Sequence, residues 1–492
     1  MRSRASSVAL VAGALAVGCS SSSSSASGHD GGQTSKTPDA GHADSGKADT
    51  GSVVHDAGRA DAQPDAGAGE TGAADSGAGD AGPGDVSLPP CTSGCSASAI
   101  EHLVLIVQEN HTFDNYFGAY CTAAPGSNPT CTTGPACCEA APATDPSGAS
   151  PVLLNDSSNG LYNPNHQQAC ELSEIDNGKM DMYVTGTSCS GPGNFAIANF
   201  SSVGPYWTYA TEGSIADRYF QPIVGASSSN DMYLARANFV FVDNSYEPSA
   251  KGASCVGGTQ MDFTGPTIAD LLVGAGVTFG VYAGGYASAL AAAPGCGPVP
   301  AACPAGFAIY PCEYDPSDIP FEYYSTLSDN PLYMKDISAF ATDIAAEKLP
   351  AFSYVKAIGY LTEHPGVRDT ISGGISFVQS IESAVASSPY AKNTLVLVTW
   401  DESGGYFDHV APPAASTIDN QPYGPRIPLM ALGTFAKANT VSHVTMEHSS
   451  IVKFVEWNWL GQKTGQLGTR DTVVNNIGSM LDGTKTGIAV PE

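Results

Sequence analysis

Basic side chains are scarce in this sequence. Lys and Arg together number 20 among 492 residues, whereas Asp and Glu number 48, and the formal net charge is -28. Proteins that bind nucleic acid carry clustered Lys and Arg, so a balance this acidic argues against such a partner. It argues equally against electrostatic attraction to anionic membranes. The charge by itself does not indicate a catalytic activity.

Several familiar signatures are also missing. The sequence has no Gly-x-Ser-x-Gly elbow, which weakens a serine esterase interpretation, and no Walker-type loop for nucleotide phosphates. It has no internal repeat, and no paired Cys-x-x-Cys motifs that would indicate a zinc cluster. The apolar run at 8–17 is too short for a transmembrane helix. One large globular domain is therefore expected.

The first ninety residues do not belong to that domain. Two arginines, the apolar run at 8–17 and small residues before Cys19 are typical of a lipoprotein-type signal peptide, placed at 1–19. Lipidation of Cys19 would anchor the chain at the outer membrane or cell surface; an ordinary secretory signal is the alternative. Residues 20–90 are rich in Ser, Ala, Gly and Asp and are predicted to form a disordered tether. The folded domain is expected at 91–492.

The chain has 13 cysteines, too many for a reducing compartment. Without Cys19 an even number remains, and most of these lie in Gly- and Pro-rich segments. Even numbers of cysteines in an exported chain are typical of disulfides. We therefore predict disulfides, although the sequence does not indicate their pairing.

Two short apolar runs end in acids. Residues 103–107 read LVLIV and are followed by Gln108, Glu109 and Asn110, and residues 395–400 read LVLVTW and are followed by Asp401 and Glu402. Such runs are typical of parallel strands that are buried on both faces. Ligands of parallel sheets bind beyond the carboxyl ends of the strands. We therefore expect these polar residues to meet at one edge of a sheet.

Other segments alternate between strand and helix patterns. Apolar runs predict further strands at 277–282, 351–358 and 427–432. Spacing and capping residues predict helices at 111–120, 267–272, 375–385 and 449–460. This alternation predicts an α/β fold, a three-layer α/β/α sandwich with a mostly parallel central sheet.

Carboxylate and amide oxygens at one sheet edge suit a hard divalent cation. We therefore predict one divalent metal ion held near Glu109, Asn110, Asp401 and Glu402, through which a phosphate ester could bind. The alternative is that these acids only cap the helices that follow them. Two acidic pairs after two buried strands favour the metal site.

Histidines and serines near the same edge could complete a catalytic site. His364 follows the predicted strand at 351–358 and could protonate a leaving oxygen or bind metal, or be an ordinary surface histidine. His166 lies in a loop, where a functional and a structural role are equally open. The segment 227–229 offers three serines, and a serine ionised by a metal can attack phosphorus. Serine-rich loops are common, so this segment alone is a weak signal.

Two longer motifs resemble a known family. Residues 109–118, ENHTFDNYFG, resemble the opening signature of the bacterial phospholipase C and acid phosphatase phosphoesterase family, which usually reads Glu-Asn-Arg-Ser-Phe-Asp-x-x-Phe-Gly. Residues 401–413, DESGGYFDHVAPP, resemble its second signature closely. Shorter matches follow in the order of the family at 178–181, 363–365, 424–428 and 447–450.

The resemblance implies an alkaline-phosphatase-like fold, a metal ion at the sheet edge and a Ser or Thr nucleophile. The metal and phosphate residues of the family would correspond to Glu109, Asn110, Asp401 and Glu402. His364 resembles an active-site histidine of the family, and His166 resembles one that lines the phosphate pocket.

The resemblance also indicates a nucleophile. In the family the nucleophile stands three residues before the Asn of a Pro-Asn-Arg segment. Asn230 matches that Asn, which makes Ser227 the candidate nucleophile. The resemblance also implies that Ser227 is a metal ligand. Asp231 replaces the usual Arg, so Ser228 remains the alternative.

Further residues are expected around the site. Asp408 and His409 are expected to support the loop that carries Asp401 from outside the metal shell, and Asp181 is placed with them. A histidine of the family that precedes a Pro-Phe-x-Tyr segment is replaced here by Asp318 or Ile319.

The sequence therefore predicts an exported, metal-assisted phosphoesterase. It would act on phospholipids as a phospholipase C or on phosphomonoesters as an acid phosphatase, and the short segment after the last signature favours monoesters. A surface-anchored protein that binds phosphate but has lost catalysis is the alternative, motivated by the departures at His111, Asp231 and Asp318.

Overall fold

The structure is a computed structural model that describes residues 95–492 apart from 243, 245–248, 253–259 and 293–313. The predicted signal peptide at 1–19, the lipidation of Cys19 and the tether at 20–90 lie outside the described residues. The same holds for the cysteines Cys91, Cys255, Cys296, Cys303 and Cys312.

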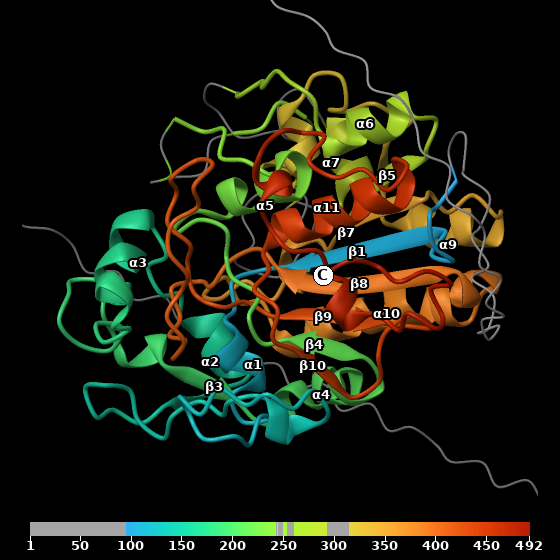
Figure 1. Ribbon diagram of the computed structural model, residues 1–492. Coiled ribbons are helices and arrows are strands. Elements are labelled where there is room, and N and C mark those ends of the chain that lie inside the picture. The colour runs from blue at the N-terminus through green and yellow to red at the C-terminus, as the bar shows by residue number, and fades with distance from the viewer. Residues whose placement is uncertain (1–94, 243, 245–248, 253–259, 293–313) are drawn as a thin grey trace, which may run out of the picture. The chain divides into compact units, whose positions relative to one another are not determined.

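A sheet of eight strands forms the centre of the described domain (Figure 1). The strands are β1 (His102–Gln108), β4 (Ser214–Ala216), β5 (Phe279–Ala283), β6 (Met334–Asp336), β7 (Phe352–Lys356), β8 (Thr394–Trp400), β9 (Leu429–Leu432) and β10 (Thr440–Ser442). Their order is β10-β4-β9-β8-β1-β7-β5-β6. Neighbours are parallel except for β9, which runs antiparallel to β8 and β4. A separate pair, β2 (Val152–Leu154) and β3 (Ala196–Ala198), is parallel.

Helices cover both faces of this sheet. One face packs against α5 (Ser227–Arg236), α6 (Ile268–Gly274), α7 (Tyr286–Ala292) and α11 (His448–Trp459). The other packs against α1 (Phe113–Phe117), α4 (Phe200–Glu212), α9 (Ser338–Ala345) and α10 (Ile371–Ala386). Two further helices, α2 (Asp156–Leu161) and α3 (Gln168–Ile175), lie beyond the ends of the strands (Figure 1). The predicted three-layer sandwich with a mostly parallel sheet is confirmed.

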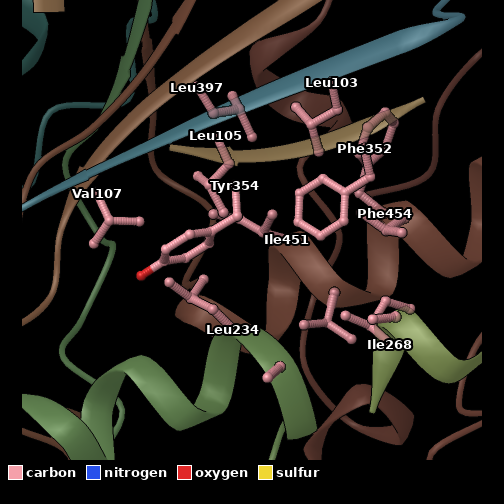
Figure 2. Packing of buried hydrophobic residues seen from close by; sticks show 14 of the residues in the cluster. Leu103, Leu105, Val107, Leu234, Ile268, Phe352, Tyr354, Leu397, Ile451 and Phe454 are labelled. Atoms are coloured by element: carbon pink, nitrogen blue, oxygen red, sulfur yellow. The ribbon is translucent and has the colours of Figure 1, made fainter. Parts of the chain in front are cut away.

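β1 is buried on both faces, as its apolar run predicted. Leu103, Leu105 and Val107 point into the cluster formed with α5, α6 and α11 (Figure 2). Val104 and Ile106 belong to the opposite cluster, formed with α4 and α10. Successive strand residues point to opposite faces, so a strand without polar positions requires helices on both sides.

The register of β1 and β8 determines where the acids lie. The two strands are parallel neighbours, and Gln108 is paired with Trp400. The next residues, Glu109 and Asp401, therefore leave the sheet side by side at its carboxyl edge. This confirms that the two acid-bearing segments meet at one edge of the sheet.

Disulfides constrain the loops that follow β1. They join Cys121 to Cys138, Cys131 to Cys137 and Cys170 to Cys189, and Cys95 is also disulfide-bonded. The prediction of disulfides is confirmed for these cysteines, and the bonds are consistent with export from a reducing cytosol. Within the described ranges, no helix is long and apolar enough to cross a membrane.

Replacing both cysteines of the Cys170–Cys189 pair with serine is expected to lower the free energy of unfolding by about 3 kcal/mol. The two residues are 19 positions apart, and a cross-link of that length restricts the unfolded chain. Denaturant unfolding followed by tryptophan fluorescence measures the difference. The same change at Cys131 and Cys137, 6 positions apart, should cost only about 2 kcal/mol. A larger loss there would contradict the loop-length argument.

Candidate active site

The turn after β1 brings Asn110 against Asp401. The backbone N–H of Asn110 donates a hydrogen bond to Asp401 Oδ1 at 2.8 Å, across 291 residues of sequence. Asn110 has φ 66°, in the left-handed region that Asn tolerates better than most residues. Gly404 packs on this turn, and a Cβ there would lie 2.3 Å from the Asn110 carbonyl oxygen, so only Gly fits. These contacts hold the two sequence signatures together.

His166 orients the side chain of Asn110. Its Nδ1–H donates to the Pro164 carbonyl at 3.0 Å, so Nε2 is the acceptor for Asn110 Nδ2 at 3.4 Å. Burial and the nearby His364 lower the pKa of His166 to about 4, which keeps the ring neutral. Because the amide nitrogen faces His166, the amide oxygen is turned away from it. Asn110 Oδ1 is buried and has no hydrogen-bond partner among the described residues.

Ser227 begins α5 and lies next to Asp401. Its hydroxyl hydrogen-bonds the Asp401 carboxylate, and both side chains are buried. Asn230, one turn further along α5, accepts from Ile223 N–H at 3.1 Å and donates to the Gly225 carbonyl at 2.8 Å. These bonds tie the start of the helix to the preceding turn. The first amides of a helix carry partial positive charge, so an anion is favoured beside Ser227.

A small pocket of about 120 Å³ opens beside Ser227. The three serines at 227–229 form the first turn of α5, and Ser227 is the one among them that lines the pocket. Charged, polar and apolar side chains complete the wall, among them Glu109, Tyr314, Asp315, Asp318, Ile319, Lys356 and His364. The pocket therefore combines a hydroxyl, an imidazole, an ammonium group and several carboxylates.

A buried ion pair forms part of the pocket wall. Lys356 Nζ lies 2.7 Å from Glu109 Oε1 and 4.0 Å from Asp231 Oδ2. Burial alone would raise the pKa of Glu109, but Lys356 and His364 lower it below its ordinary value. Burial raises the pKa of Asp401, a shift that Lys356 opposes and Glu109 reinforces. The two shifts differ in direction because Lys356 pairs directly with Glu109 at 2.7 Å, whereas burial dominates for Asp401.

Glu363, the residue before His364, is held by hydrogen bonds from aromatic side chains. Glu363 accepts hydrogen bonds from Tyr116 OH at 2.6 Å, Tyr206 OH at 2.5 Å and Trp400 Nε1 at 3.0 Å. Burial raises the pKa of Glu363 to about 7, and these hydrogen bonds oppose the shift. The Nδ1–H of His364 donates to the next backbone carbonyl at 2.8 Å, which leaves Nε2 as its second functional nitrogen.

Glu402 is held by neighbouring polar groups. Its Oε2 accepts from Gly404 N–H at 2.6 Å, and its carboxyl group also hydrogen-bonds Glu171 of α3. Glu171 accepts from Ser403 Oγ at 2.7 Å and from Gly225 N–H at 2.6 Å. Burial raises the pKa of Glu171 to about 7, so it can carry the proton that two carboxyl groups in contact must share. Glu171 therefore connects the turn before α5 to the loop after β8.

Asp408 and His409 join the loop after β8 to α1. Asp408 accepts from Arg426 Nε at 2.8 Å and from Asp114 N–H at 3.1 Å. His409 bonds Asp114 at 2.7 Å and Glu139 at 3.1 Å. Asp114, Asp408 and His409 are close enough to share a metal ion. However, Arg426 already pairs with both aspartates and supplies the positive charge that they need, which makes this cluster an ion-pair network.

The sheet edge also offers oxygen donors for a divalent cation. A buried amide oxygen without a partner is costly, and Asn110 Oδ1 is such an atom. The carboxylates of Glu109 and Asp401 and the hydroxyl of Ser227 are buried as well, and Asp401 contacts both Ser227 and the backbone of Asn110. These are the oxygen donors that hard cations prefer.

A sequence model of the Phosphoesterase family matches residues 100–460, a range that contains all of the site residues described above. The chain belongs to the Phosphoesterase family. The resemblance inferred from the two signatures is thereby confirmed.

Curated relatives include several phospholipases C. "Non-hemolytic phospholipase C" of Pseudomonas aeruginosa is 29% identical over 168 residues, which cover 27% of this chain and 24% of that protein. A protein of the same name from Burkholderia pseudomallei is 25% identical over 73% of this chain and 55% of its own length. "Phospholipase C B" of Mycobacterium tuberculosis is 22% identical over 78% of each. The matches thus span about a quarter of the first relative and about half of the second.

Solved structures that resemble this chain have low identity to it. One is a protein in the alkaline phosphatase superfamily from Vibrio parahaemolyticus, with 10% identity and a TM-score of 0.35 over 80% of this chain and 73% of that chain. Another is the phosphonate monoester hydrolase from Silicibacter pomeroyi, with 11% identity and a TM-score of 0.28 over 52% and 68% of the chains.

The remaining predicted site residues occupy different places. Asp318 and Ile319 both line the pocket, and Asp318 hydrogen-bonds Glu109. Asp181 is half-buried and interacts with Asp176 and Lys179. Among the described residues, no interaction reported above joins Asp181 to Asp408 or His409, where it was predicted to lie.

Sequence reasoning missed Lys356 and Glu171. Lys356 is the last residue of β7 and pairs with Val107 of β1, so it reaches the same edge as Glu109. A lysine at the carboxyl end of an otherwise apolar strand was the signal that could have found it. Glu171 lies in a loop-rich region with no comparable pattern.

Proposed function

We propose that this chain is a metal-assisted phosphoesterase that hydrolyses phosphate ester bonds through Ser227. The observation that carries the proposal is the meeting of Ser227, Asp401 and Asn110 beside a pocket lined by His364. Membership of the Phosphoesterase family supports the same class of reaction.

Ser227 would act as the nucleophile. Its hydroxyl proton passes to Asp401 as the serine oxygen forms a bond to phosphorus. The bond between phosphorus and the leaving oxygen breaks in line, and His364 donates a proton to that oxygen. Water then attacks the phosphoserine and breaks the bond between phosphorus and the serine oxygen, with His364 accepting one proton of the water. Asp401 returns to Ser227 the proton that it accepted in the first step. The free amides at the start of α5 stabilise charge on the phosphoryl oxygens.

Glu109, Asn110 and Asp401 would hold one divalent ion, with Ser227 and Glu402 as further ligands. When bound, such an ion stabilises negative charge at the phosphoryl group. His166 contributes by keeping the oxygen of Asn110 available, since it accepts from the amide nitrogen.

Two classes of substrate fit this proposal. The names of the curated relatives favour a phospholipase C, which would release a phosphorylated headgroup from a phospholipid. The small pocket favours compact phosphomonoesters, because its volume of about 120 Å³ is below the range of about 300–1,000 Å³ usual for larger ligands.

Turnover of p-nitrophenyl phosphate and of its phosphocholine ester by the metal-loaded protein separates these classes. Hydrolysis of the monoester alone is expected for a phosphatase, and hydrolysis of the choline ester for a phospholipase C. A folded protein that binds inorganic phosphate but turns over neither compound would instead be a phosphate-binding protein on the same fold. That result would refute the enzyme proposal.

We further propose that the protein works outside the cytoplasm, as a lipoprotein anchored through Cys19 or in secreted form. The disulfides support export. Membrane contact would then come from the lipid on Cys19, since a net charge of -28 disfavours attraction of the chain to anionic lipids.

A further inference from the structure

A buried lysine lies among the acids of the pocket. Only 3% of the Lys356 side chain is exposed, and its Nζ lies 2.7 Å from Glu109 Oε1 and 4.0 Å from Asp231 Oδ2. Among the described residues that line the pocket, Lys356 is the one Lys or Arg.

The ammonium group of Lys356 has unused hydrogen-bonding capacity. An ammonium can donate three hydrogen bonds. Within the described part of the chain, Glu109 is its one acceptor at hydrogen-bonding distance, because 4.0 Å to Asp231 is too long. A buried charge with unused donors is costly, so the pocket side of this group is suited to the oxygen of a ligand.

Acidic side chains surround the ammonium group of Lys356. Its Nζ lies 2.7 Å from Glu109 Oε1 and 4.0 Å from Asp231 Oδ2, and Asp318 lines the same pocket. Asp231 and Asp318 are positions at which the sequence departs from the family signatures toward acids. A phosphate dianion entering beside these carboxylates would be repelled unless a fixed positive charge faced it.

We propose that Lys356 is a phosphate-binding residue, donating from Nζ to a non-bridging oxygen of the phosphoryl group that Ser227 attacks. This inference rests on the proposed function. Lys356 supplies a positive charge carried by the chain itself, in addition to that of the divalent ion. Its pairing with Glu109 holds the ammonium at the pocket wall without saturating its donors.

Titration of the full-length, metal-loaded protein with inorganic phosphate in a calorimeter tests the proposal. Lys356→Met removes the charge at similar length and is expected to weaken phosphate binding about 10- to 100-fold, whereas Lys356→Arg retains part of the affinity. Lys335→Met is the matched control, because Lys335 pairs with Asp343 at 2.5 Å away from the pocket and should not affect phosphate binding. Metal content, measured in parallel, should not change in Lys356→Met.

Two outcomes would overturn the role of Lys356. One is phosphate affinity in Lys356→Met within about two-fold of the unmodified protein. The other is a loss of metal that parallels the loss of affinity, since the lysine would then act only through Glu109. If Lys356→Met does not fold, a crystal structure with vanadate decides: an oxygen about 3 Å from Nζ supports the proposal, and a nearest oxygen beyond about 4 Å overturns it.

Failure of the proposed function gives a different result. If the unmodified protein binds phosphate but hydrolyses neither nitrophenyl ester, the function is overturned while the titration of Lys356→Met still tests phosphate binding. If it neither binds phosphate nor hydrolyses either ester, the function and this inference are overturned together. A protein that does both, with Lys356→Met unaffected, overturns the inference alone.

Discussion

Replacing Ser227 with alanine is expected to lower the turnover of any phosphate ester on the order of 10⁴-fold or more, because it removes the attacking oxygen. The fold should survive, since the N-cap of α5 is Ala226 and the Ser227 side chain caps no backbone amide. Initial rates with p-nitrophenyl phosphate or its choline ester, together with thermal unfolding, measure both effects. A phosphoserine formed at Ser227 during turnover and detected by mass spectrometry would support the same assignment.

The neighbouring serines provide matched controls for this experiment. Ser229→Ala alters the same helical turn, and Ser229 does not line the pocket, so activity should stay close to that of the unmodified protein. Ser228→Ala tests the alternative nucleophile. Intact turnover in Ser227→Ala combined with loss of turnover in Ser228→Ala would transfer the role to Ser228 and contradict the mechanism proposed above.

Burial explains which parts of the fold could be predicted from the sequence. β1 and β8 contain continuous apolar runs at 103–107 and 395–398 because helices cover both faces, and such runs are visible without a structure. The strand at 427–432 was also predicted, but its antiparallel direction was not. Apolar runs indicate that a segment is buried and contain no information on direction.

The helix α5 shows why part of the site could not be predicted. It begins with the residues Ser227, Ser228, Ser229 and Asn230, which are weak helix formers, and nearly all of its side chains are buried. A helix without an exposed face has no polar stripe, so the usual period of 3.6 residues is absent. Packing against the sheet and α11 stabilises it instead. The resemblance singled out Ser227 as the candidate nucleophile, but its position at a helix N-terminus could not be predicted.

Long-range polar contacts were equally hidden. Glu171 reaches Ser403 across 232 residues, and Glu109 reaches Lys356 from a different strand. Neither contact has a local sequence pattern, because each depends on the order of strands in the sheet. The edge acids were predictable only because two strands with similar ends are adjacent.

Removal of the divalent ion is expected to lower turnover by about 10³-fold or more, since the metal supplies several kcal/mol of charge stabilisation in reactions of this kind. Activity should return when a divalent ion is added back after chelation. Asp401→Asn is expected to reduce both metal content and turnover, because it removes a buried carboxylate at the sheet edge while an amide oxygen can still accept from Asn110 N–H. Elemental analysis and rate measurements on the same samples test both expectations.

Asp217→Asn is the control that separates a site effect from the general cost of losing a buried carboxylate. Asp217 is as buried as Asp401, but its partner is His443 at 2.9 Å, and it does not line the pocket. Its replacement should leave metal content and turnover unchanged. Equal losses in the two variants would mean that Asp401 acts on stability and not on the metal. Full turnover by a metal-free sample would contradict the proposed metal site altogether. Phosphate would then have to bind beside the carboxylates of Glu109 and Asp401 with Lys356 as the positive charge on the pocket wall.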